Sequence, residues 1–476
     1  MAGTISRGIR APIVRDGDDV VQIVADAVLK AAEQDGFTLH PRDVVAVTEA
    51  VVARADGNYC TVDDIAADVK EKLGDTVGVV FPIMSRNRFA ICLKGIARGA
   101  KKVVVLLSYP ADEEGNHLID EDALFDAGVN PYSDVLNEES FVRLFGEPRH
   151  TFTGVNYVQY YRSLIEAEGA EALILFGNDP AAILKYTDVV LCCNIHERTR
   201  TARRLLKAGA ARVLTLCDIM NAPRNGSGYQ PDYGLLGSNK ATEDVIKLFP
   251  KNAQAVADAI RAELFRRTGV QVEAMVYGDG AFKDPVGKIW ELADPVVSPG
   301  YTAGLNGTPN ELKLKYLADN DFADLSGEAL ASAIRDSIRA KDADLKGQMA
   351  SEGTTPRRLT DLIGSLCDLT SGSGDKGTPV VSPAYTDGLI GQPNELKLKY
   401  LADNEFKDLS GDALESAIRA RIREKEKNLV GRMDSQGTTP RRLTDLIGSL
   451  CDLTSGSGDK GTPIVLVQNY FNNYAD

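Results

Sequence analysis

The chain has 476 residues, of which 43% are hydrophobic and 26% are charged, as in an ordinary globular protein of several domains. Its formal net charge is −14, which excludes an overall attraction to nucleic acid or to anionic membranes. Seven cysteines, none in a C-x-x-C pair, favour neither a disulfide framework nor a zinc site. We expect a cytoplasmic location, because no apolar run reaches the ~18 residues of a spanning helix and no signal core opens the chain.

The first region alternates strands with helices, which is typical of α/β structure. Asp18 and Asp19 are expected to cap the first helix and Thr61 a later one, because short acceptor side chains precede an apolar run at each place. We predict strands at 5–14, 43–47, 76–81 and 102–107, and helices at 19–34, 62–73 and 89–98.

A polar connector at 108–155 leads into a second stretch in which strands and helices alternate. Its three expected strands alternate with helices, which predicts a small, mostly parallel sheet. The strands are predicted at 172–176, 188–193 and 212–216, with helices at 180–185 and 199–208. A long loop at 220–239, an amphipathic helix at 252–267 and a strand at 272–277 follow.

An internal repeat fills the C-terminal part of the chain. Residues 298–379 and 382–463 align without gaps at a period of 84, with 18 differences in 82 positions. Two copies are too few for a solenoid, so we interpret the repeat as a duplicated segment of one globular domain. Only the second copy runs into an apolar strand, at 463–467.

The chain is thus predicted to be an α+β (mixed α/β) protein. The predicted divisions are an N-terminal α/β part, an inserted α/β subdomain, a core part with a metal-site strand, and the two repeat copies. Their boundaries are 1–107, 108–230, 231–297, 298–381 and 382–476.

Two arginines flank an asparagine where an expected strand meets a helix, in the segment Ser85-Arg86-Asn87-Arg88. Guanidinium groups beside the amides of a helix start form a fitting site for phosphate or carboxylate. The alternative is that both arginines lie on the surface and pair with acidic side chains. A similar choice applies to Arg54, which follows another strand and either binds an anion or pairs with Glu49.

Asp279 lies between two glycines after the strand at 272–277. A carboxylate with room on both sides can hold a cation near a phosphate, although Asp-Gly is also ordinary turn chemistry. A Gly/Ser loop that occurs in both repeat copies could wrap phosphates with its amides, or it is a flexible linker. Its candidate residues are Gly374, Asp375, Gly458 and Asp459.

In chain order, these motifs resemble the coenzyme F420-0:L-glutamate ligase (gamma-glutamyl ligase) family. The segment at 43–57 resembles the family's Ser/Thr…Ser-Lys-x-Glu-Gly, with Arg54 in place of the lysine. Residues 234–239 resemble Gly-Ile-Asp-x-Ser-Asn, and 276–280 resemble Ile-Thr-Asp-Thr-x-Gly. The helix, Gly-rich loop and apolar strand at 443–467 resemble the family's C-terminal segment.

The resemblance implies amide formation between L-glutamate, or a similar amine, and a small-molecule carboxylate acceptor through an acyl phosphate. It implies GTP (or ATP) and Mg²⁺ or Mn²⁺, with K⁺ as a further candidate, and Asp279 as a metal ligand. It also implies a homodimer, whereas the acidic net charge and the lack of a spanning segment predict neither nucleic-acid nor membrane partners. The residues it assigns to nucleotide or anion binding are Arg54, Ser85, Arg86, Asn87, Arg88, Ser238, Asn239, Gly374, Asp375, Gly458 and Asp459.

Two other functions stay open. Leu236 stands where the family has an aspartate, and Ser373 or Ser457 where it has an acidic residue in the Gly-rich loop. These departures favour a non-catalytic homologue that binds a nucleotide or metabolite. The spare repeat copy favours an assembly protein, because it exposes a segment whose pairing site is already filled.

Overall fold

The fold is taken from a computed structural model of the chain, which forms two compact units. Unit 1 comprises Met1–Val52, Asn252–Gly280 and Val296–Asp476, and unit 2 comprises Ala53–Lys251 and Ala281–Pro295. Helices and mixed sheets occur together, so the predicted α+β class is confirmed. The residues that the structure describes are 5–150, 154–278, 282–283, 290–291, 299–305, 320–351, 406–411, 413–414, 416–417, 420 and 464–468.

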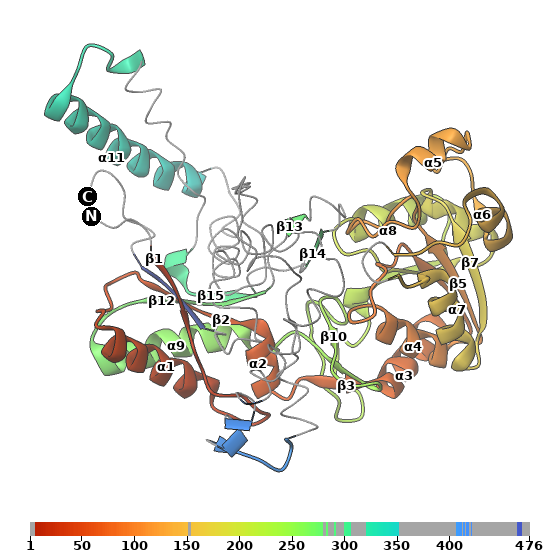
Figure 1. Cartoon of the computed structure of the whole chain (residues 1–476), viewed down its shortest axis with the longest axis horizontal. Coiled ribbons are helices and arrows are strands. Elements are labelled where there is room, and N and C mark those ends of the chain that lie inside the picture. Colours follow the sequence, from red (N-terminus) through yellow and green to blue (C-terminus); the bar gives the residue numbers. More distant parts are fainter. Residues whose placement is uncertain are drawn as a thin grey trace. The chain divides into compact units, whose positions relative to one another are not determined.

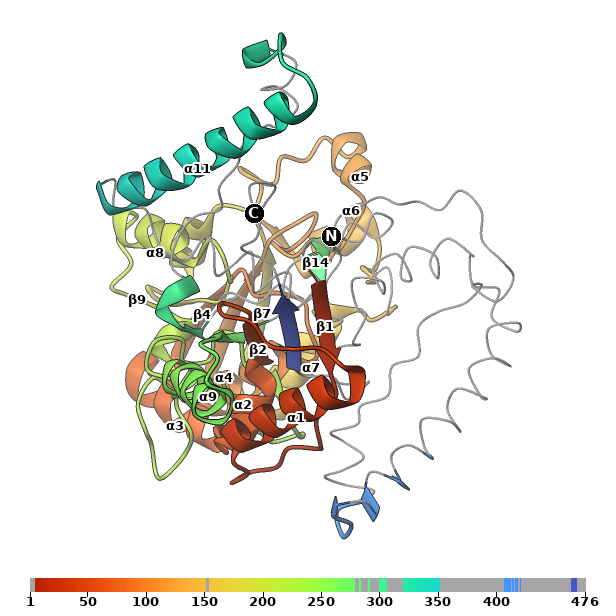
Figure 2. The same ribbon diagram turned by 90° about the vertical axis from the view of Figure 1, so that its left-hand side faces the viewer.

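Unit 1 is built on a five-stranded sheet with the order β1-β16-β2-β12-β15. β2 and β12 are parallel, and the other neighbours are antiparallel. Figure 2 shows β16, the blue strand, beside β1 although the two lie at opposite ends of the sequence. The strands are β1 (Ile5–Ile9), β2 (Val44–Thr48), β12 (Glu273–Tyr277), β15 (Gly300–Tyr301) and β16 (Ile464–Gln468).

Two long helices pack against each other beside this sheet (Figure 1). Asp19 caps the first of them as predicted, because its side chain accepts from the amides of Val21 and Gln22. The helices and 3₁₀ turns of unit 1 are α1 (Val20–Asp35), α9 (Ala253–Thr268), η3 (Ala303–Leu305) and α11 (Gly327–Ser351), and α2 (Glu49–Ala55) leads into unit 2.

The sheet of unit 1 takes one strand from each copy of the internal repeat. β15 lies at the start of the first copy, and the apolar strand expected after the second copy is β16. Leu466 is fully buried at the centre of β16, and Val467 pairs with β1 on one side and β2 on the other. After the first copy, Ser382 and Pro383 stand at the corresponding positions, and proline cannot donate to the ladder of a central strand. Only the end of the second copy can therefore complete this sheet.

The strand at the start of the first copy requires a glycine, because Gly300 in β15 lies against the first turn of α9. A Cβ atom at Gly300 would lie 2.4 Å from both the carbonyl carbon and the carbonyl oxygen of Ala253. The second copy has Ala384 at the corresponding position. The two copies are thus not interchangeable, and one sheet uses the beginning of one and the end of the other.

We therefore expect Gly300→Ala to lower the free energy of unfolding of unit 1 by about 1–3 kcal/mol, the usual cost of overpacking against a fixed backbone. Two 84-residue deletions provide the comparison. Deleting 353–436 keeps Gly300, whereas deleting 298–381 brings Ala384 into its place. Urea denaturation should find the second deletion less stable, and Ala384→Gly should restore it. Equal stability of the two deletions would contradict the role of Gly300.

Unit 2 is built on a six-stranded sheet with the order β6-β7-β5-β4-β8-β9. All neighbours are parallel except β6, which pairs antiparallel with β7. The predicted division at residue 107 falls inside this sheet, because β4 and β5 pair with the strands of the second stretch. The strands are β4 (Thr76–Val80), β5 (Lys102–Leu107), β6 (Leu136–Asn137), β7 (Glu171–Phe176), β8 (Val189–Cys192) and β9 (Arg212–Thr215).

Helices cover both faces of this sheet, which explains why its strands are almost continuously apolar. Val103 and Val105 belong to one apolar cluster, whereas Val104 and Leu106 belong to another, as the alternation of a strand requires. The first cluster includes residues of α3 (Val62–Leu73), α4 (Ala90–Gly99) and α7 (Tyr157–Ala167), and the second includes residues of η1 (Pro180–Lys185) and α8 (Arg198–Lys207).

The remaining elements of unit 2 include three that the sequence prediction missed and one helix whose type differs from the prediction. The predicted connector at 108–155 contains α5, β6 and α6, and the helix predicted at 180–185 is the 3₁₀ helix η1. Their short length gives little periodicity to detect. The smaller elements are α5 (Glu121–Asp126), α6 (Glu138–Phe145), η2 (Leu216–Asp218), the sheet of β3 (Tyr59–Thr61), β10 (Asn239–Lys240) and β11 (Val245–Lys247), and the hairpin of β13 (Phe282–Lys283) and β14 (Trp290–Glu291).

Within the described ranges, every helix is too short or too polar to cross a membrane.

Candidate functional site

The sheet of unit 2 reverses its winding direction beside its first strand. From β4 the chain adds β5 and β7 on one side, and then β8 and β9 on the other. Ligands of doubly wound sheets bind outside the carboxyl ends of the strands at such a reversal. Here those ends are followed by residues 81–89 after β4 and by residues 193–197 after β8. The segment Ser85-Arg86-Asn87-Arg88 therefore lies at the edge where a ligand is expected.

The turn formed by Ser85–Arg88 is fixed by its own hydrogen bonds. The Ser85 side chain accepts from the amide of Arg88 (3.1 Å), and the Ser85 carbonyl accepts from the amide of Ala90 (2.9 Å). Arg86 and Asn87 are exposed, whereas Ser85 and Arg88 are half-buried. The turn thus presents one guanidinium group and one side-chain amide to solvent on a closed backbone.

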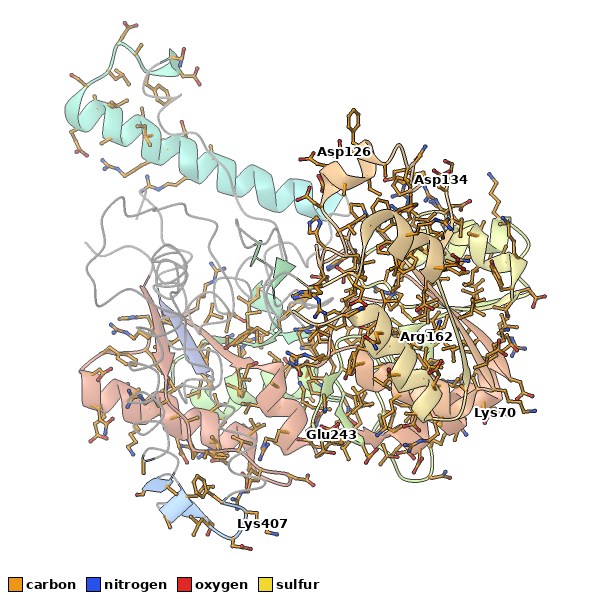
Figure 3. All side chains as sticks on the ribbon, turned by 45° about the vertical axis from the view of Figure 1, so that its right-hand side comes forward. Lys70, Asp126, Asp134, Arg162, Glu243 and Lys407 are labelled. Atoms are coloured by element: carbon orange, nitrogen blue, oxygen red, sulfur yellow. The ribbon has the colours of Figure 1, made fainter. Side chains whose placement is uncertain are left out.

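The hydroxyl group of a tyrosine in α7 anchors the start of the turn by two hydrogen bonds. The hydroxyl group of Tyr161 is fully buried, donates to the carbonyl of Ile83 (2.6 Å) and accepts from the amide of Ser85 (3.0 Å). α7 is itself held in place by Arg162, labelled in Figure 3, whose guanidinium pairs with the carboxylate of Glu138 in α6. Burial raises the pKa of Tyr161 well above its usual value, so this hydroxyl stays protonated.

Asp112, in the loop after β5, also anchors the start of the turn. One of its carboxylate oxygens accepts from the amide of Met84 (2.7 Å) and from the side chain of Asn116 (2.7 Å). The other oxygen accepts from the amides of Glu114 (3.0 Å) and Asn116 (2.9 Å). Burial raises the pKa of Asp112 to about 7 although all four donors favour the ionised form.

The network continues from Asp112 back to the exposed side of the turn. Asn116 contacts the ring of His150, with 2.9 Å between Oδ1 and Nε2. Arg86 interacts with His150 through its charge and hydrogen-bonds with Tyr157. Burial and the charge of Arg86 lower the pKa of His150, so the ring is neutral at pH 7. The guanidinium of Arg86 thus lies beside neutral groups, where it remains available to an anionic ligand.

The structure also brings the segment that contains Ser238 and Asn239 to this turn. The amide of Lys240 donates to the carbonyl of Asn87 (2.7 Å). Ser238 is buried, and its hydroxyl lies 3.4 Å from the thiol of Cys92 in α4. Ser238 therefore has a packing role in the structure, whereas Asn239 is half-buried at the start of β10.

A second polar cluster lies at the same edge of the sheet, where residues 195–197 follow β8. Glu113 accepts from the amides of Ile195, His196 and Glu197, directly before α8. Glu114 lies 3.3 Å from Nε2 of His196, and this contact raises the pKa of the histidine. The carboxylate of Glu113 thus occupies the amides just before α8. An external anion that binds there would therefore have to be held by cationic side chains.

The other predicted site residues lie in another element or outside the described residues. Arg54 is buried at the end of α2. The metal site predicted at Asp279 lies outside the described residues, as do Gly374, Asp375, Gly458 and Asp459. Across the described part of the chain, no three His, Cys, Asp or Glu residues gather in a way that could hold a metal ion.

Sequence reasoning found the turn but missed the residues that position it. Two of them, Asp112 and Tyr161, hold main-chain groups that lie 28 to 78 positions away in the sequence. The only local signal was the position of Asp112 just after a buried strand, where α/β proteins place ligand-binding side chains. The residues missed are Asp112, Asn116, His150, Tyr157 and Tyr161.

The chain matches the model of the F420-0:Gamma-glutamyl ligase family over residues 8–383 and again over residues 384–469. These matches span most of the chain, so the protein belongs to this family. The second match falls on the second repeat copy, which therefore duplicates a segment of the ligase domain itself. No curated protein matches the chain.

Proposed function

We propose that the protein joins L-glutamate, or a similar amine, to a small carboxylate acceptor at the expense of GTP or ATP. Membership of the gamma-glutamyl ligase family supports this proposal. The observation that carries it is the Ser85–Arg88 turn, which is held by Asp112 and Tyr161 at the carboxyl edge of the sheet of unit 2. The nucleotide carries phosphate groups, and L-glutamate and the acceptor carry carboxylates. These are the groups that arginine recognises best.

The proposed reaction has two steps. An acceptor carboxylate oxygen attacks the terminal phosphorus of the nucleotide, and the nucleoside diphosphate leaves, so that an acyl phosphate forms. The amine nitrogen then attacks the acyl carbon, phosphate leaves, and the amine gives up one proton. Arg86 would orient an anionic group of a substrate, and Asn87 would donate a hydrogen bond to it.

A divalent ion, Mg²⁺ or Mn²⁺, is part of the proposal, and when bound it would neutralise charge on the transferring phosphoryl group. Asp279 is its proposed ligand, and K⁺ is a further candidate ion. A homodimer in the cytoplasm is proposed on the same family basis.

Thermal-shift measurements with GTP, GDP and ATP, each with and without Mg²⁺ or Mn²⁺, test nucleotide binding. A nucleotide at ~100 times its Kd should stabilise the fold by ~2.7 kcal/mol. We expect a metal-dependent shift in the wild type and in Arg143→Ala, which removes an exposed arginine of α6. We expect the shift to be lost in Asp279→Ala and reduced in Arg86→Ala.

Two other outcomes would change the conclusion. A nucleotide shift without phosphate release, when L-glutamate and a panel of small carboxylates are present, would favour a non-catalytic nucleotide-binding homologue. No shift with any nucleotide would overturn the phosphoryl-transfer proposal. An assembly role would then gain support from a mass that depends on concentration and falls when residues 298–381 are deleted.

A further inference from the structure

A histidine and a glutamate lie close together at the same edge of the sheet as the Ser85–Arg88 turn. His196 follows β8, and its ring nitrogen Nε2 lies 3.3 Å from Oε1 of Glu114, in the loop after β5. The side chain of Glu114 is 7% exposed, whereas that of His196 is 50% exposed. The pair thus joins a buried carboxylate to an imidazole that small molecules can reach.

The main chain on both sides of this pair is fixed by neighbouring carboxylates. Glu113 accepts from the amides of His196 (3.1 Å) and Glu197 (3.3 Å). The amide of Glu114 donates to Asp112 (3.0 Å). The imidazole is therefore held through its own backbone and through its contact with Glu114, which is the arrangement that orients a histidine for proton transfer.

Asp112 also connects the pair to the Ser85–Arg88 turn. One oxygen of its carboxylate accepts from the amide of Glu114, and the other accepts from the amide of Met84, directly before the turn. A single buried side chain thus fixes both the residue that contacts His196 and the backbone that leads into the turn.

The strand order places the pair and the turn on the two sides of the reversal in the sheet. β4 and β8 are neighbours, and the amide of Cys193 donates to the carbonyl of Val80 (2.9 Å), so the pairing continues to the ends of both strands. The turn follows β4 and His196 follows β8. A ligand in the position that such a reversal provides would lie between them.

The ring of His196 has one nitrogen that can accept a proton. The contact with a carboxylate favours the ring proton on Nε2, which leaves a lone pair on Nδ1. Over the described part of the chain, Nδ1 has no hydrogen-bond partner, and Oε1 of Glu114 makes no hydrogen bond to another group. Nδ1 can therefore take a proton from a bound molecule.

His196 is also the stronger base of the two histidines near the turn. The contact with Glu114 raises its pKa against the opposing effect of burial, and Glu113 raises the pKa further whereas Arg198 lowers it. Burial lowers the pKa of His150 instead. A base whose pKa lies near the working pH combines a strong tendency to accept a proton with a useful deprotonated fraction.

We propose that His196 is the general base of the second chemical step and that Glu114 orients it. This assignment rests on the proposed function. As the amine nitrogen attacks the acyl carbon, Nδ1 accepts the proton that the nitrogen loses, and the C–O bond to phosphate breaks with its electron pair leaving on phosphate. The imidazolium then returns its proton to solvent, so the base is regenerated.

Hydroxylamine separates this step from the first one. It is largely unprotonated at pH 7, so it captures an acyl phosphate as a hydroxamate without a general base. The full chain is assayed with nucleotide, Mg²⁺, a panel of small carboxylates and either hydroxylamine or L-glutamate. We expect His196→Gln to form the hydroxamate at the wild-type rate and to lose about 100-fold or more in amide formation, the usual contribution of a general base.

Glu114→Gln tests the orienting role, because it keeps the size of the side chain and removes its charge. The neutral amide no longer raises the pKa of His196, so the rise of amide formation with pH should move to lower pH. The rate of amide formation should fall while hydroxamate formation stays, whereas a purely structural role would lower both. His117→Gln, three residues further along the same loop, is the control and should resemble the wild type in both reactions.

Amide formation by His196→Gln at the wild-type rate would overturn this proposal and leave the ligase mechanism intact. An equal loss of hydroxamate and amide formation would also overturn it, because His196 would then act on the first step or on the fold. No hydroxamate from the wild type with any nucleotide and carboxylate would overturn the proposed function itself, and this proposal with it.

Discussion

Replacing Val467 by proline is expected to lower the free energy of unfolding of unit 1 by about 3 kcal/mol or more. Val467 lies in β16, which has β1 on one side and β2 on the other. Proline in a central strand removes a ladder hydrogen bond and introduces a steric clash, at a cost of about 3 kcal/mol or more. Because a domain is stable by only about 5–15 kcal/mol, a loss of about 3 kcal/mol removes roughly a fifth to three fifths of that stability.

Val467→Ala is the matched control, because it keeps the backbone amide that proline lacks. Urea denaturation followed by circular dichroism gives the free energy of unfolding, and hydrogen exchange of the β2 amides locates the loss in unit 1. We expect fast exchange of β2 in Val467→Pro and near-native exchange in Val467→Ala. Native-like exchange in both variants would show that β16 does not occupy the centre of the sheet.

The same argument explains why only the end of the second copy supplies a strand to the sheet of unit 1. Val467→Pro makes β16 more like residues 380–384, which follow the first copy and already contain Pro383. The duplicated segment ends before the strand, because residues 380–384 repeat the entry segment at 296–300, and only the second copy is followed by β16. The glycine needed at the other edge of the sheet, Gly300, is in turn absent from the second copy.

Much of the secondary structure could be predicted from local sequence. α3 and β5 have the predicted bounds, because Thr61 is a clear N-cap and Val103–Leu107 is a continuous apolar run. The pairing of distant strands could not be predicted. Nothing local indicates that β5 pairs with β7 across 63 intervening residues, or that β15, with two residues, belongs to the sheet of unit 1.

The candidate site shows the same limit. The Ser85–Arg88 turn was predicted from residue types that suit anions at a strand–helix junction. Its supports come from Asp112 and Tyr161, which are hydrogen-bonded to main-chain groups of Met84 and Ser85. A main-chain amide leaves no trace in the sequence, so these partners become visible only in the structure.

Asp112→Ala is expected to lower the stability of unit 2 by about 3–5 kcal/mol and to weaken anion binding at the turn. The carboxylate is buried and accepts four hydrogen bonds, from three amides and the side chain of Asn116. Each buried donor left without an acceptor costs about 1–3 kcal/mol, partly relieved by relaxation of the loop. Met84 would be freed from its anchor, so the backbone that presents Arg86 would lose its fixed position.

The pH dependence of this loss distinguishes the carboxylate from a purely packing role. Burial raises the pKa of Asp112 to about 7 in the folded state, above its value in the unfolded chain. The folded state therefore binds more protons between pH ~4 and ~7, and the contribution of Asp112 to stability falls as pH rises through that window. The stability difference between wild type and Asp112→Ala should thus shrink by roughly 1.4 kcal/mol per pH unit between about pH 5 and 7.

Asn116→Ala is the control for this measurement, because it removes one neutral donor and leaves the carboxylate in place. Urea denaturation of the three proteins at pH 5, 6, 7 and 8 gives the differences directly. We expect Asn116→Ala to keep most of the wild-type slope with pH, and Asp112→Ala to lose it. A stability difference for Asp112→Ala that is constant from pH 5 to 8 would mean that Asp112 stays ionised, and that its four donors outweigh its burial.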